Sequence, residues 1–121
     1  MASPSLQSLF RHSEDLVDFA AGTTVFSEGD VGDAMYVVKD GEVDIVVHGK
    51  VVETVGSGGI VGEMALIDPG PRSASVIARS PCTLVKISPA RFQFLVQQTP
   101  FFAIEVMRML VRRLRHMDAI V

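Results

Sequence analysis

The 121-residue sequence has a single cysteine, no excess of positive charge and no long apolar run. Cys82 has no second cysteine to pair with, so an internal disulfide is excluded. The net charge of −3 gives no overall attraction to nucleic acid, so any anion site must be local. No apolar stretch approaches the roughly 18 residues of a membrane-spanning helix, and Met1 to Gln7 lacks the features of a signal peptide. We therefore expect a cytoplasmic, soluble protein without a membrane span.

Residues suited to catalysis or metal binding are also scarce. The three histidines, His12, His48 and His116, are far apart, and none forms a His-x-His or His-x-x-x-His ligand pair. Cys82 precedes a predicted strand and has no neighbouring histidine, which favours a core or turn position over a nucleophile. The sequence therefore predicts neither a metal or other cofactor nor an enzyme.

The length and pattern of the chain predict one domain over residues 1–121 with three parts. The 48% of apolar residues can form a real core in a chain of this length. Residues 1–22 are expected to be helical, 23–88 to form strands, and 89–121 to form helices. In the first part, Leu16, Val17 and Phe19 follow Ser13, which is predicted to be a helix N-cap.

Closely spaced turns divide the middle of the chain into short strands. Asp40-Gly41 and His48-Gly49 lie between apolar runs, and each pair predicts a tight hairpin. Repeated short strands of this kind favour a β-sandwich or jelly roll. The predicted strands are 35–38, 43–47, 51–55, 76–78 and 83–87.

The last part of the chain predicts two helices. Ser88-Pro89 opens the first, and Thr99-Pro100 opens the second. Apolar residues at helical spacing predict that the second helix buries the stripe of Ile104, Met107, Val111 and Leu114. The opposite face, with Arg108, Arg112 and Arg115, is interpreted as solvated. Additional apolar residues favour contact with the strand region or with a second copy of the helix.

The segment 59–75 contains the clearest candidate site. Gly62 lets the backbone approach a ligand, and the helix-forming run 64–66 offers unpaired N–H groups to an anion. Arg72 supplies a fork of donors that matches phosphate. Glu63 can only accept hydrogen bonds when ionised, so its partner would be a hydroxyl, such as one on a ribose. This combination indicates a nucleotide, although a Glu63–Arg72 salt bridge that only holds the loop is the structural alternative.

This motif resembles the phosphate-binding cassette of cyclic nucleotide-binding domains, with Val61-Gly62-Glu63-Met64-Ala65-Leu66 followed by Pro71-Arg72-Ser73-Ala74. The resemblance implies a mainly β fold, an eight-stranded antiparallel β-roll or jelly roll with N-terminal and C-terminal flanking helices. It also implies that Glu63 bonds the ribose 2′-hydroxyl and that Arg72 and Ser73 bind the cyclic phosphate. The ligand-binding residues expected on this basis are Val55, Val61, Gly62, Glu63, Met64, Ala65, Arg72, Ser73 and Ala74.

The same resemblance predicts a sensor module that binds cyclic AMP more readily than cyclic GMP, because members that prefer cyclic GMP often have threonine at the position of Ser73. Related bacterial regulators bond the purine with a Thr-Ser pair, where this chain has Met117-Asp118, so Arg115 or His116 is an alternative base contact. Those regulators dimerise through this helix, which implies a homodimer here. Since no DNA-recognition helix precedes Val121, we expect no direct DNA binding and an effector protein of unknown identity.

Two other functions fit the same pattern. The chain could be an interaction protein with this fold and no nucleotide binding. It could also be the sensor fragment of a larger channel, transporter or kinase.

Overall fold

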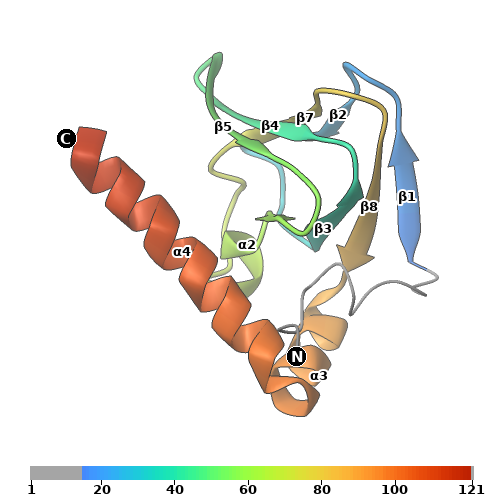
Figure 1. The fold of residues 1–121 in the computed structure, drawn as a ribbon, viewed down its shortest axis with the longest axis vertical. Coiled ribbons are helices and arrows are strands. Elements are labelled where there is room, and N and C mark those ends of the chain that lie inside the picture. Colours follow the sequence, from blue (N-terminus) through green and yellow to red (C-terminus); the bar gives the residue numbers. More distant parts are fainter. Residues whose placement is uncertain (1–14, 121) are drawn as a thin grey trace, which may run out of the picture.

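The computed structural model describes residues 15–120, with side chains to His116. The chain forms two four-stranded antiparallel sheets, followed by helices that pack against the first sheet (Figure 1). In spatial order the first sheet contains β1 (Leu16–Phe19), β8 (Cys82–Ile87), β3 (Met35–Asp40) and β6 (Ile60–Val61). The second contains β2 (Thr24–Phe26), β7 (Ser75–Ala78), β4 (Val43–Val47) and β5 (Lys50–Val55). The helices are α2 (Met64–Ile67), α3 (Pro89–Gln98) and α4 (Pro100–Ile120).

The expected mainly β architecture of eight antiparallel strands with C-terminal helices is confirmed. Any helix within residues 1–14, including the proposed N-cap Ser13, lies outside the described residues. Figure 1 shows α4 as a long rod beside the β-roll, on the side where α2 lies.

The strand β3 of the first sheet is buried on both of its faces over residues 35–38, as its continuous apolar run requires. Successive side chains of a strand point to opposite faces. Tyr36 and Val38 therefore pack between the two sheets, whereas Met35 and Val37 pack against the helices. Cys82 belongs to the inter-sheet core, as expected, and burial raises the pKa of its thiol.

The C-terminal helices begin where the sequence predicts. Ser88 caps α3, because its Oγ accepts a hydrogen bond of 3.2 Å from the Arg91 backbone N–H, and Pro89 occupies the first turn. After Thr99, α4 starts at Pro100. The two helices share one core with the first sheet, which includes Leu95 of α3.

The prediction of which apolar stripe of α4 is buried is wrong. Ile104, Met107, Val111 and Leu114 are between 43% and 60% exposed. The helix instead buries the neighbouring stripe of Phe102, Val106 and Met109. Both stripes are apolar and have helical spacing, so only the position of the first sheet determines which one is covered.

The N-terminal segment 16–19 is a strand, not the expected helix. β1 pairs antiparallel with β8, with Leu16 opposite Val85 and Phe19 opposite Cys82. Its alternating exposure has the period of a strand, and the edge of β8 supplies its hydrogen-bond partners. Pairing with a strand more than 60 positions away outweighs the local helix signal.

Only one of the two predicted hairpins exists. His48-Gly49 joins β4 to β5, with Val47 opposite Lys50. Asp40-Gly41 instead ends β3 and passes the chain to the other sheet, because β3 pairs with β6 and β8 while β4 pairs with β5 and β7. Gly41 has φ 85°, and a Cβ there would lie 2.5 Å from the Pro81 carbonyl oxygen.

Gly41→Ala should lower the free energy of unfolding by about 3 kcal/mol, since it adds left-handed backbone strain and a collision with the chain at Pro81. Gly49→Ala is the matched control, because Gly49 also has positive φ, at 79°, but nothing lies within 4 Å of its added Cβ. We expect this control to lose about 1 kcal/mol in urea denaturation. Equal losses for the two variants would contradict the described passage between the sheets.

Candidate functional site

A cavity of about 290 Å³ lies at α2 and the segment that leads from α2 to β7. Apolar side chains of the second sheet, Phe26, Ile45 and Val76, form part of its wall. The structure gathers here most of the predicted ligand-binding residues, namely Val61, Gly62, Glu63, Met64, Ala65, Arg72, Ser73 and Ala74. Val55 is not among the lining residues and is buried between the sheets.

Arg72 is a buried cation held by carbonyl groups. Only 6% of the Arg72 surface is exposed to solvent. The Nη1 group donates to the Gly62 carbonyl oxygen at 2.9 Å, and Nη2 donates to that of Ala34 at 2.5 Å. The guanidinium lies 4.0 Å from the centre of the Phe26 ring, which stabilises the positive charge. Its Nε has no hydrogen-bond partner among the described residues.

Glycine at position 62 makes room for this guanidinium. Gly62 has φ 80°, which side-chain-bearing residues rarely adopt. A Cβ at this position would also lie 2.8 Å from Arg72 Nη1. Glycine at position 62 therefore leaves the space that the Arg72 guanidinium occupies, in addition to letting the backbone come close to a ligand.

The Glu63–Arg72 salt bridge considered as the structural alternative does not form. Within residues 15–116, none of the ion pairs involves Arg72. Burial removes water from the guanidinium and lowers the pKa of Arg72, but the group remains charged at physiological pH. A buried positive charge with an unused donor and no carboxylate contact is arranged to receive an anion.

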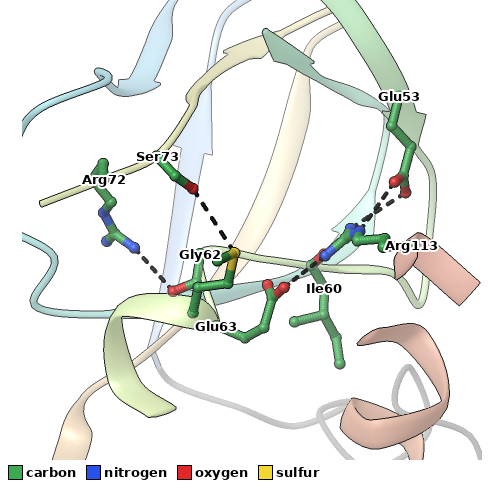
Figure 2. A network of polar contacts seen from close by, with 8 residues as sticks. Glu53, Ile60, Gly62, Glu63, Arg72, Ser73 and Arg113 are labelled. Carbon is green, nitrogen blue, oxygen red and sulfur yellow. Dashed lines mark hydrogen bonds and ion pairs between the residues drawn. The ribbon is translucent and has the colours of Figure 1, made fainter. Parts of the chain in front are cut away.

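Glu63 contacts a residue that the sequence analysis missed. It is 3% exposed, and its Oε1 accepts a hydrogen bond of 2.9 Å from Nη1 of Arg113 on α4. The same guanidinium donates to both carboxylate oxygens of Glu53 on β5, at 3.0 and 3.3 Å, and to the Ile60 carbonyl oxygen at 2.6 Å. Figure 2 shows this network, with Arg113 between the two glutamates.

Arg113 could have been found from its place in the helix. The buried stripe of α4 runs through Val106 and Met109, and Arg113 takes the next position on that face. A charge in line with an apolar stripe requires a buried partner. The partner itself could not be identified, because Glu63 is 50 residues away in the chain.

Ser73 lies beside the cavity with only a weak partner. Its Oγ is 3.8 Å from Sδ of Met64, and a thioether is a poor hydrogen-bond acceptor. Both side chains are exposed, so the Ser73 hydroxyl can turn to a better acceptor without loss. Figure 2 shows Ser73 and Arg72 on one side of Glu63, with Arg113 on the other side.

A second cavity of about 730 Å³ lies between α4 and the strand β5 with its following turn. Arg113 lines both cavities, whereas Glu53 and His116 line only the larger one. Arg115, the other proposed base contact, is exposed, and the side chains of Met117 and Asp118 lie outside the described part. The larger cavity is lined by Val55, Gly59 and Ile60 but by none of residues 61–74, which contain the matched motif, so the smaller one is the candidate site.

The cassette and the fold together define the class of protein. The pattern of cyclic nucleotide-binding domains matches residues 16–99. The chain belongs to the cyclic nucleotide-binding domain family, and it is a regulatory domain of that class.

Three relatives describe the position of the chain within this family. It is 37% identical over 108 residues to the Pycsar effector protein XpPycTIR of Xanthomonas perforans. The aligned region covers 88% of this chain and 36% of the relative. The catabolite activator protein of Thermus thermophilus is 32% identical with a TM-score of 0.77, over 86% of this chain and 51% of that one. The cAMP-bound form of the EAL enzyme Bd1971 is 36% identical with a TM-score of 0.64, over 83% and 28%. The chain therefore spans between 28% and 51% of the length of these proteins.

Two further features of the described residues bear on other uses of the fold. No helix in this part of the chain has both the length and the apolar character needed to cross a bilayer. Within the same residues, no three histidine, cysteine or acidic side chains lie close enough to hold a metal ion.

Arg113→Met should lower the free energy of unfolding by about 2–3 kcal/mol, because it leaves the buried Glu63 carboxylate without its cation. Arg112→Met is the matched control, since Arg112 is exposed, and it should change stability by less than about 0.5 kcal/mol. The double variant Arg113→Met with Glu63→Gln should recover part of the loss in the same denaturant titrations. A loss for Arg113→Met no larger than that for Arg112→Met would refute the anchoring role.

Proposed function

We propose that this chain binds cyclic AMP in preference to cyclic GMP and that α4 transmits the occupancy of the site to an effector protein. The observation that supports this most strongly is Arg72, a buried cation with an unused donor in a cavity that also presents the Glu63 carboxylate. The chain acts in this proposal by binding and release, without catalysis.

The phosphate end of the site would be formed by Arg72 and Ser73. Carbonyl oxygens are weaker acceptors than a charged phosphate, so the guanidinium can exchange a carbonyl contact for a charge-assisted one. The Ser73 hydroxyl can donate to the phosphate in place of the Met64 sulfur. Backbone N–H groups at the start of α2, near Ala65, add further donors.

The ribose would bind at Glu63. Arg113 occupies Oε1, and no group of the described residues hydrogen-bonds to Oε2. A ribose 2′-hydroxyl can therefore donate to Oε2 while Arg113 keeps its contact. This arrangement engages both carboxylate oxygens and fixes the orientation of Glu63 before the ligand arrives.

Occupancy would reach α4 through this shared carboxylate. Phosphate binding changes the charge and the contacts around α2. Leu66 of α2 packs against the core that α3 and α4 share with the first sheet. A ligand shifts α4 only if it binds one arrangement of Arg113 and α2 better than another. The relative XpPycTIR is named an effector protein, which supports an output of this kind.

The base preference must come from residues of this chain. The EAL enzyme Bd1971 has both a cAMP-bound and a cGMP-bound form, so similarity to it does not select a base. Ser73 in place of threonine favours cyclic AMP. The competing function, an interaction protein without a ligand, would leave Arg72 buried without any anion partner.

Arg72→Ala should weaken cyclic AMP binding by about 2–5 kcal/mol, roughly 30-fold to several thousand-fold, because it removes the cation from a buried phosphate. Isothermal titration calorimetry measures this directly. The matched control is Arg79→Ala, since Arg79 is exposed and pairs with Asp44 outside the cavity, and it should change affinity less than about threefold. If neither cyclic nucleotide gives heat with the unaltered protein, the interaction protein is the better description.

The exposed stripe of α4 supports self-association. Ile104, Met107, Val111 and Leu114 follow one another at intervals of three, four and three residues, the spacing of a two-stranded coiled coil. A second copy of α4 would present the same spacing and cover the stripe. We therefore propose a homodimer in which the two α4 helices pair.

Met107→Glu with Val111→Glu should convert the dimer to a monomer in sedimentation equilibrium, because two carboxylates would be buried at the seam. Phe94→Glu is the control, since Phe94 is an exposed apolar residue on α3 at 60% exposure and should leave the dimer intact. A wild-type protein that sediments as a monomer would exclude this pairing.

A further inference from the structure

The charged groups of the site follow an order that matches the parts of a nucleotide. Arg72 donates to the Gly62 carbonyl, Glu63 is the next residue, Arg113 donates to Glu63, and Glu53 accepts from Arg113. Figure 2 shows Arg72 and Glu53 at opposite ends of this series. In a cyclic nucleotide the base is attached to the ribose carbon next to the one that bears the 2′-hydroxyl. With the phosphate at Arg72 and the 2′-hydroxyl at Glu63, the base therefore points toward Arg113 and Glu53.

The strand register places Glu53 next to the wall of the nucleotide cavity. Glu53 of β5 is the direct cross-strand partner of Ile45 of β4, so their side chains lie on the same face of the sheet. Ile45 lines the smaller cavity, Glu53 lines the larger one, and Arg113 lines both. A base that extends past Ile45 reaches the Glu53–Arg113 pair.

This pair offers one edge of donors and one of acceptors. The Arg113 guanidinium only donates hydrogen bonds, and the Glu53 carboxylate only accepts them. Each carboxylate oxygen has two acceptor positions, and the two contacts with Arg113 use only part of this capacity. The Glu53 side chain is 37% exposed, so its remaining positions are accessible.

Adenine matches this edge and guanine does not. Adenine presents an acceptor at N7 beside a donor at its N6 amine, which suit the arginine and the glutamate respectively. Guanine presents two acceptors, N7 and O6, on the same edge. An ionised carboxylate facing O6 has no hydrogen to share, so the contact is repulsive.

We propose that Glu53 is the specificity-determining residue of this site and that it selects adenine over guanine by accepting from the N6 amine and repelling O6. This inference rests on the proposed function, since it requires the phosphate at Arg72 and the ribose at Glu63. It assigns the base contact to β5, at the end of the site where Arg113 already joins the strand to α4.

The test compares three cyclic nucleotides by calorimetry: cyclic AMP, cyclic GMP and cyclic IMP, which carries O6 like guanine but lacks its 2-amino group. The unaltered protein should bind cyclic AMP about 10-fold or more tightly than either 6-oxo nucleotide. Glu53→Gln should reduce that ratio by about 10-fold, because the amide can donate to O6. Any loss of Arg113 anchoring in this variant affects all three ligands and cancels in the ratio.

Glu105→Gln is the matched control, since Glu105 lines the same larger cavity but pairs with Arg108, and its ratios should stay within about twofold of wild type. Unchanged ratios in Glu53→Gln, or equal affinity of the unaltered protein for cyclic AMP and cyclic IMP, overturn the inference. The second measurement needs no variant. Absence of binding by every cyclic nucleotide would instead refute the proposed function itself.

Discussion

Arg113 joins α4 to the β-roll through one guanidinium that contacts β5, β6 and the residue before α2. Two carboxylates share this cation, and one of them, Glu63, is almost fully buried. Because a buried carboxylate without a cation is costly, the position of α4 and the orientation of Glu63 depend on each other. Any ligand that engages Glu63 is therefore linked energetically to the helix, and the helix to the ligand.

The other charged group of the site, Arg72, is kept apart from this network. Its hydrogen bonds go to two carbonyl groups, and its positive charge lies over the Phe26 ring. The close packing around it depends on Gly62, where a Cβ would meet the guanidinium. Arg72 and Glu63 thus line one cavity without forming an ion pair with each other. Both side chains therefore remain able to bind a ligand that carries a phosphate and a hydroxyl.

Much of this organisation could be predicted from local sequence, and the errors share one cause. His48-Gly49 and Ser88-Pro89 act within a few residues of themselves, and the structure has the hairpin and the helix start that they predict. Asp40-Gly41 carries the same hairpin signal but joins two different sheets. Leu16–Phe19 became a strand because β8 offers it an edge. In both errors the deciding contact comes from a segment far away in the chain.

The sequence by itself determined which donors and acceptors the cassette offers, because Gly62, Glu63, Arg72 and Ser73 lie within one short segment whose residue types suit a phosphate and a hydroxyl. It also determined the strands β3, β4, β5, β7 and β8 and the starts of the two long helices, which depend on turns and caps close in the chain. Only the tertiary structure decided which stripe of α4 is buried and that Arg113 pairs with both Glu63 and Glu53. Burial and ion pairing depend on which surfaces meet, and residues 50 and 60 positions apart meet only once the sheets and α4 have packed.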